Sequence, residues 1–152
     1  RFAVETLFDP HTYHDLMRRV DALQPDAVRQ WGQMSAAQML EHVARALEVP
    51  VGKRASTQAV MGRLIGWIFR QRFLGPTPLS RNGPTAPGFV VQDEPDFVAT
   101  KHRVRALLSE FHIAADRGCD GRVHGFFGPM SGAEWGVMQY KHVDHHLRQF
   151  GA

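Results

Sequence analysis

Apolar residues recur every three or four positions in four long stretches of this sequence, which is the spacing of amphipathic α-helices. The stretches run over residues 9–24, 35–49, 96–117 and 131–150. At 152 residues the chain has the length of one ordinary domain and can bury a hydrophobic core. The pattern therefore predicts one all-α domain over residues 1–152, built as a four-helix bundle.

Residues typical of helix ends flank these stretches. Asp9 is expected to cap the first helix, with Pro10 at its first helical position. Gly118 is expected to end the third helix in a C-cap. The other two helices should begin with a capping box, a serine followed three positions later by Gln or Glu: Ser35 with Gln38, and Ser131 with Glu134.

A long connection separates the second and third bundle helices. It contains a short amphipathic helix predicted over residues 57–72, followed by two Pro- and Gly-rich runs, 75–78 and 83–88, that favour irregular chain. Connections of this length are uncommon in compact domains unless they cross the domain or cover a site. We expect a crossover that can also act as a lid. Residues 121–130 should form a loop before the last helix.

Composition and charge exclude several classes of protein. Lys and Arg are scattered among acidic residues, and the net charge is only +3, so we expect no nucleic-acid partner. The most apolar stretch, 60–74, is interrupted by arginines and should not span a membrane. Cys119 is the single cysteine, so no intramolecular disulfide can form and a cytoplasmic location is expected.

Three histidines are candidates for metal ligands. His142 and His146 are one helical turn apart and share a face of the last helix, while His42 is expected on the inward face of the second helix. Imidazole nitrogens suit Zn, Ni, Cu or Fe. Three protein ligands leave one coordination position free, as in catalytic zinc sites. The same histidines could also form a polar edge of the bundle, and spacing alone does not decide between the two interpretations.

Two residues beside these ligands are candidates for catalysis. Gln38 lies one turn before His42 and could orient a ligand, or it could only complete the capping box. His145 adjoins the ligand pair but should lie closer to Lys141, on the solvent side of the last helix. His124 could approach a substrate, although a hydrogen bond to the backbone is the favoured interpretation. Two pairs at i, i+4 spacing are interpreted as surface ion pairs: Glu41 with Arg45, and Asp144 with Arg148.

Several motifs together resemble a known superfamily. They are WGQMSAAQMLEH at residues 31–42, HGFFG at 124–128, Trp135, and KHVDHHLRQF at 141–150. This combination resembles a branch of the DinB/YfiT-like superfamily. The resemblance covers both ends of the chain, whereas residues 51–93 contribute little. It implies a four-helix bundle of DinB/YfiT-like topology that binds one divalent ion, often zinc or nickel, at the positions of His42, His142 and His146.

The resemblance also carries expectations about activity. Some DinB/YfiT-like proteins are thiol-dependent S-transferases or isomerases that use a low-molecular-weight thiol, so a small-molecule substrate is expected here. A metal-dependent hydrolase, in which metal-bound water is the nucleophile, is the alternative enzyme. The third alternative is a non-catalytic, metal-stabilised interaction module in which residues 60–74 dock a partner or a second subunit. A homodimer is therefore left open.

Overall fold

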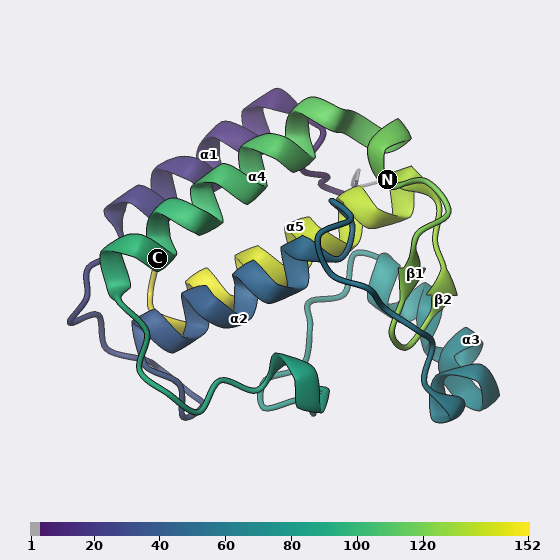
Figure 1. Cartoon of the computed structure of the whole chain (residues 1–152), viewed down its shortest axis with the longest axis horizontal. Helices are drawn as coiled ribbons and strands as arrows, with labels where there is room; N and C mark the ends of the chain where they lie inside the picture. Colours follow the sequence, from purple (N-terminus) through teal and green to yellow (C-terminus); the bar gives the residue numbers. More distant parts are fainter. Residues whose placement is uncertain (1–3) are drawn as a thin grey trace.

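The computed structural model describes residues 4–152, which are mostly helical (Figure 1). The elements in chain order are α1 (Pro10–Ala22), α2 (Ala36–Glu48), α3 (Val60–Leu74), the short 3-10 helix η1 (Pro87–Phe89), α4 (Phe97–Cys119), β1 (Val123–His124), β2 (Gly128–Pro129) and α5 (Gly132–Gln149). The prediction of an all-α fold is confirmed. The loop expected over residues 121–130 contains one small addition, an antiparallel pair of two-residue strands.

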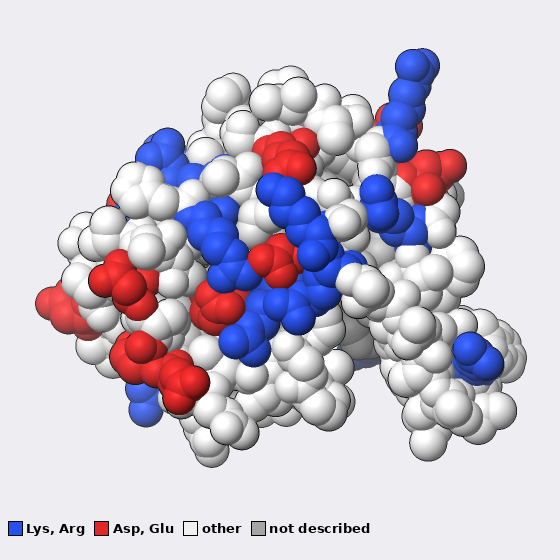
Figure 2. Space-filling view, viewed as in Figure 1, with Lys and Arg blue, Asp and Glu red and all other residues white. Residues whose placement is uncertain are grey.

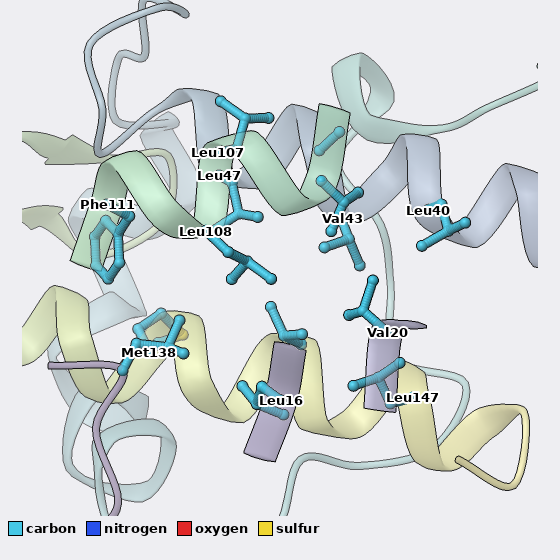
Figure 3. Packing of buried hydrophobic residues seen from close by; sticks show 14 of the residues in the cluster. Leu16, Val20, Leu40, Val43, Leu47, Leu107, Leu108, Phe111, Met138 and Leu147 are labelled. Carbon is cyan, nitrogen blue, oxygen red and sulfur yellow. The ribbon is translucent and has the colours of Figure 1, made fainter. Parts of the chain in front are cut away.

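Four helices, α1, α2, α4 and α5, pack around one hydrophobic core. α2 lies against α4, and α4 also contacts α1 and α5. Figure 3 shows leucine, valine and methionine side chains from these four helices meeting between the ribbons. Leu16 of α1, Leu47 of α2 and Leu147 of α5 are all almost completely buried. Burial of each such side chain contributes roughly 1.5–3 kcal/mol, so this core fixes how α2 and α5 face each other.

The helix starts agree with the sequence, but one helix end does not. The Asp9 side chain accepts a hydrogen bond from the Thr12 amide, and both predicted capping boxes are formed. The C-cap expected at Gly118 is wrong, because α4 runs on to Cys119 and is capped by Asp120. The backbone kinks earlier, at Ala115, where φ is 56°. The kink redirects the last turn of α4, so a glycine near the end of the helix is not where the helix stops.

The predicted helix in the connection is α3, which begins three residues later and ends two residues later than expected. It stands apart from the four-helix core, next to the β1–β2 hairpin and α5 (Figure 1). Its contact with the hairpin is close, since a Cβ atom added to Gly62 or Gly66 would lie 2.2 or 2.7 Å from the Phe126 carbonyl oxygen. The Arg70 guanidinium adds an ion pair to Glu134 of α5 at 2.7 Å.

Lys141 corrects the predicted solvent face of α5. The sequence pattern placed it on the exposed side, yet its side chain is buried. Its ammonium group donates hydrogen bonds to the carbonyl oxygens of Phe73, Gly75 and Thr77 at 2.5, 2.8 and 2.7 Å. The end of α3 leaves carbonyl groups that need donors, and a lysine from α5 supplies three. The prediction failed because α3 covers this side of α5, which a helical wheel of α5 alone cannot show.

The two predicted ion pairs are present. Glu41 pairs with Arg45, and Asp144 with Arg148, each at 2.9 Å. Both carboxylates are also bound from another helix, Glu41 by Arg103 of α4 and Asp144 by Arg19 of α1. These pairs therefore link neighbouring helices, which a pattern of i, i+4 spacing does not reveal. Within residues 4–152, no helix combines the length and the apolar character that crossing a membrane requires.

Candidate metal centre

The structure brings His42 of α2 together with His142 and His146 of α5. One ligand nitrogen from each of the three rings lies within 4.8 Å of the other two. The capping box at Ser35 fixes where α2 begins, and the core packing of α2 and α5 then sets the two faces against each other. His142 and His146 are one turn apart, so both rings reach the same point between the helices. This three-histidine cluster could hold a metal ion.

The rings are oriented for convergence on a common centre. The Nε2 atoms of His42 and His142 are 3.0 Å apart. The three ring centroids are separated by 4.6–4.9 Å, with interplanar angles of 59°, 72° and 83°. Ligand nitrogens around a tetrahedral zinc ion, each about 2.05 Å from the metal, are roughly 3.3 Å from one another. The Nε2 pair is therefore close to the separation that a shared ion requires.

Two of the rings are held by hydrogen bonds that fix their tautomers. Nδ1 of His42 lies 2.9 Å from the carbonyl oxygen of Phe89, and Nδ1 of His146 lies 2.9 Å from Oε1 of Gln149. The Gln149 amide is itself oriented, because its Nε2 donates to the Trp31 carbonyl oxygen at 2.9 Å. Both acceptors require a hydrogen on Nδ1, so Nε2 of each ring carries a lone pair. This is the arrangement of metal-ligating histidines.

His142 lacks such support. Its Nδ1 atom is buried and has no hydrogen-bond partner among residues 4–152, and the same holds for Oε1 of Gln139 one turn earlier. If His142 donates from Nε2 to the lone pair of His42, its Nδ1 carries an unpaired lone pair in a buried position. An unsatisfied buried polar atom costs about 1–3 kcal/mol. The metal-free cluster thus leaves hydrogen-bonding atoms without partners. A cation bound by the Nε2 atoms of His42 and His142 would fit it.

The electrostatics of the cluster favour neutral imidazoles. Burial lowers the pKa of His42, and burial together with the neighbouring rings lowers the pKa of His142 well below its usual range. Burial, with repulsion from His42, lowers the pKa of His146 to about 3. A histidine binds a metal only when it is neutral. All three rings are therefore ready to accept a cation at neutral pH.

Part of the long connection lies along α2 over the cluster. Its carbonyl oxygens and one carboxylate bind successive side chains on one face of α2: Phe89 with His42, Val90 with Arg45, Gln92 and Asp93 with Gln38, and Glu94 with Ser35. His42 and His146 are buried, and His142 is half-buried as a residue, with its Nδ1 atom inaccessible to solvent. The connection thus covers His42.

Comparison with known proteins places this chain in a family. A family model described as "Protein of unknown function (DUF1569)" matches residues 8–152. The chain belongs to the DUF1569 family. No curated protein and no solved structure matches it. The matched range includes all three histidines, but the family description assigns no activity. Function in this DUF1569 chain is therefore argued from the site.

The two predicted catalytic residues occupy different positions around the cluster. Gln38 completes the capping box, and its amide nitrogen lies 3.4 and 3.5 Å from the carbonyl oxygens of Gln92 and Asp93. Within residues 4–152 no hydrogen bond joins it to an imidazole. The ring of His145 lies 5.1 Å from that of His146 and 5.6 Å from the Trp31 ring. His145 is thus beside the cluster, while Gln38 holds the covering segment.

Other residues singled out in this DUF1569 sequence lie outside the cluster. His124 accepts hydrogen bonds from the amides of Phe126 and Phe127 at Nδ1, as its backbone-bonded interpretation predicted, and burial lowers its pKa to about 4. Burial raises the pKa of the Cys119 thiol to about 11, which agrees with an inert cysteine. Gln149 was missed, although its place three residues after His146 marks it as a neighbour on the same helix face.

Proposed function

We propose that this DUF1569 chain is a divalent-metal-dependent enzyme of the DinB/YfiT-like kind, with His42, His142 and His146 as ligands. In this proposal α1, α2, α4 and α5 form the four-helix bundle of that superfamily. The observation that carries the proposal is the pair of fixed Nδ1–H groups on His42 and His146. The Nε2 lone pairs of His42 and His146 therefore lie in the same buried cluster as His142, and the single N–H of the neutral His142 ring can donate to only one of them. A cation resolves that arrangement.

We propose zinc or nickel as the metal, because the DinB/YfiT-like resemblance implies these two among the ions that imidazole suits, Zn, Ni, Cu and Fe. Three neutral imidazole nitrogens suit borderline-soft divalent ions, whereas Mg²⁺ and Ca²⁺ prefer oxygen ligands. No cysteine, aspartate or glutamate joins the three histidines in the cluster found among residues 4–152. Three protein ligands leave one coordination position free for a thiol or for water.

The proposed reaction is transfer or isomerisation with a low-molecular-weight thiol as co-substrate. A divalent ion bound by three imidazoles is a Lewis acid that lowers the pKa of a coordinated thiol or water, and so supplies a nucleophile at neutral pH. Burial lowers the pKa of His145 against the opposing effect of the Asp144 carboxylate, so this ring is neutral at pH 7 and can accept a proton beside the ligands.

A cationic group lies at the edge of the site. The Arg81 guanidinium lies 4.1 Å above the Trp31 ring, which in turn contacts His145. Among residues 4–152, Arg81 makes no ion pair. We assign it to binding an anionic group of the thiol or of the acceptor substrate. Gln38 acts indirectly in this proposal, by holding the covering segment against α2.

The three-ligand cluster also favours a second candidate, a hydrolase. The position that three ligands leave free can take water, which needs no binding pocket of its own, so hydrolysis needs fewer contacts than thiol transfer. The two reactions differ in the co-substrate that they consume. A thiol that co-purifies with the protein, or a rate that depends on added thiol, favours the transferase. A rate that is independent of thiol favours the hydrolase.

The experiment measures metal content and turnover on protein purified without a histidine tag or a nickel column. We expect about one equivalent of zinc or nickel per chain, lost in His142→Ala and retained in His102→Ala, whose histidine is exposed and outside the cluster. Metal-loaded protein is then assayed against a panel of thiols and electrophiles, and against hydrolysable esters and amides. Stoichiometric metal without turnover on either panel would support the non-catalytic interaction module instead. Equal metal content in the two variants would refute the site.

A further inference from the structure

The outward face of α3 exposes an unusual amount of apolar surface. Five large side chains on this face are more than half exposed: Val60 by 72%, Met61 by 58%, Leu64 by 65%, Trp67 by 73% and Ile68 by 54%. A sixth on the helix, Phe69, is 39% exposed and lies outside this face. The lobe that α3 forms in Figure 1 is almost entirely white in the space-filling view of the same face, with little charge on it (Figure 2). Exposed apolar side chains gathered on one face in this way usually mark an interaction surface, and here one exposed polar residue, Gln71, lies among them.

These five side chains occupy one sector of the helix. At 100° per residue they span about 120°, and the opposite side of α3 is the one that contacts the protein. Gly62 and Gly66 lie against the Phe126 carbonyl there, and Arg70 is paired with Glu134. α3 is therefore firmly attached by one face and presents the other. The apolar sector is therefore exposed in the folded state, with α3 packed in place.

The edges of the apolar sector are basic. On the same wheel Arg63 adjoins the Trp67 edge and Arg72 adjoins the Met61 edge. Both are exposed, and neither has an ion-pair partner in the part of the chain that the structure describes. The sequence holds no Asp or Glu between Glu48 and Asp93. The segment that carries α3 is thus complementary to an anionic partner, and the carboxylate of Glu134, which contacts the helix from α5, is paired with Arg70.

We propose that the outward face of α3 docks on an anionic lipid bilayer. The helix lies in the plane of the interface, with Leu64, Trp67 and Ile68 in the outer acyl region and the two arginines among the headgroups. Interfacial helices combine these features, with a Trp- and Leu-bearing apolar face and basic side chains that reach the headgroups. Because α3 stands away from the four-helix core, its outward face can meet a flat surface (Figure 1).

Charge favours a lipid surface over a second copy of this chain. In a two-fold contact the same patch meets itself, so the basic edges of one copy, at Arg63 and Arg72, would lie against the same basic surface of the other. The segment from 49 to 92 offers no carboxylate to neutralise them. Like charges facing each other disfavour association. This inference does not depend on the metal site, because α3 carries none of the three ligands.

The test is binding to vesicles, measured by co-sedimentation and by tryptophan fluorescence in the Trp31→Phe variant, in which Trp67 is the exposed tryptophan and Trp135 is buried. Vesicles of phosphatidylcholine with phosphatidylglycerol are compared with vesicles of phosphatidylcholine alone. We expect binding to the anionic vesicles with a blue shift of the emission, and much weaker binding to the neutral ones. Leu64→Glu should abolish binding. Arg63→Gln and Arg72→Gln should each weaken it roughly fivefold, because each basic residue near the surface contributes about that factor.

A matched control makes the same chemical change elsewhere. Ile113→Glu replaces a side chain on α4 that is 78% exposed, so neither glutamate variant disturbs the core, and circular dichroism and melting should be unchanged in both. Binding that survives Ile113→Glu but not Leu64→Glu supports the proposal. The proposal is overturned if the wild-type protein does not bind anionic vesicles, or if Leu64→Glu and Ile113→Glu lose binding equally. A solution dimer that Leu64→Glu dissociates, found by sedimentation, would overturn it in favour of a second copy.

Discussion

Replacing Gln149 with leucine should weaken both the fold and the metal affinity. The substitution removes two hydrogen bonds of 2.9 Å, one from His146 Nδ1 and one to the Trp31 carbonyl oxygen. It leaves a donor and an acceptor without partners, at about 1–3 kcal/mol each. We expect the free energy of unfolding of the metal-free protein to fall by about 2–4 kcal/mol. For a domain of this size that corresponds to a melting temperature lower by about 5–15 °C.

The effect on the metal follows from orientation of the ligand. Without an acceptor at Nδ1, the His146 ring can rotate or change tautomer, and loss of such a supporting contact typically lowers metal affinity about 10–100-fold. Competition with a chromogenic zinc chelator measures the affinity, and calorimetry in EDTA measures the stability. Gln149→Glu separates the two effects. The glutamate keeps an acceptor for His146 Nδ1 but has no N–H to donate to the Trp31 carbonyl oxygen. The free energy of unfolding should therefore fall while the zinc affinity is retained.

The control for general destabilisation is Leu16→Ala. Leu16 is completely buried in α1, which carries no ligand, and its truncation should cost about 2–5 kcal/mol. This variant should melt as low as Gln149→Leu and still bind zinc like the wild type. The reasoning is refuted if Gln149→Leu binds zinc as tightly as the wild type despite its lower melting temperature. Gln149 would then be a packing residue and would not orient His146.

Three further predictions concern the surroundings of the site. Gly62→Ala should lower the melting temperature, because the Cβ atom of the new alanine would lie 2.2 Å from the Phe126 carbonyl oxygen. This clash should outweigh the higher helix propensity of alanine, which is worth about 1 kcal/mol. Gly88→Ala, where nothing lies within 4 Å, is its control. Lys141→Met removes three hydrogen bonds to the end of α3 and should cost about 2–4 kcal/mol, seen as faster proteolysis of residues 60–74. Because burial lowers the pKa of His124 from 6.5 to about 4, its contribution to stability is complete above pH 6.5 and is lost as the pH falls towards 4. His124→Asn keeps an acceptor for the same amides. It should reduce the dependence of the unfolding free energy on pH between 6.5 and 4, measured by urea titration in EDTA.

Local patterns in the sequence predicted the elements well. The caps at Asp9, Ser35 and Ser131 define helix starts through hydrogen bonds that close within four residues, so neighbouring residues suffice to recognise them. The i, i+4 spacing likewise put His142 and His146 on one face. Features that depend on a distant partner were not predictable in this way. The burial of Lys141 and the kink at Ala115 both reflect contacts or strain that local spacing does not encode.

The helices, their starts and the histidines that share a helix face follow from residues within one or two helical turns, so local sequence is enough to predict them. Three features instead depend on packing between distant segments: His42 meets the α5 pair, Phe89 and Gln149 fix two of the three rings, and α3 turns its apolar face outward. Core packing joins His42 to residues about a hundred positions away. The direction in which each helix faces depends on what covers it, and no single helix contains that information.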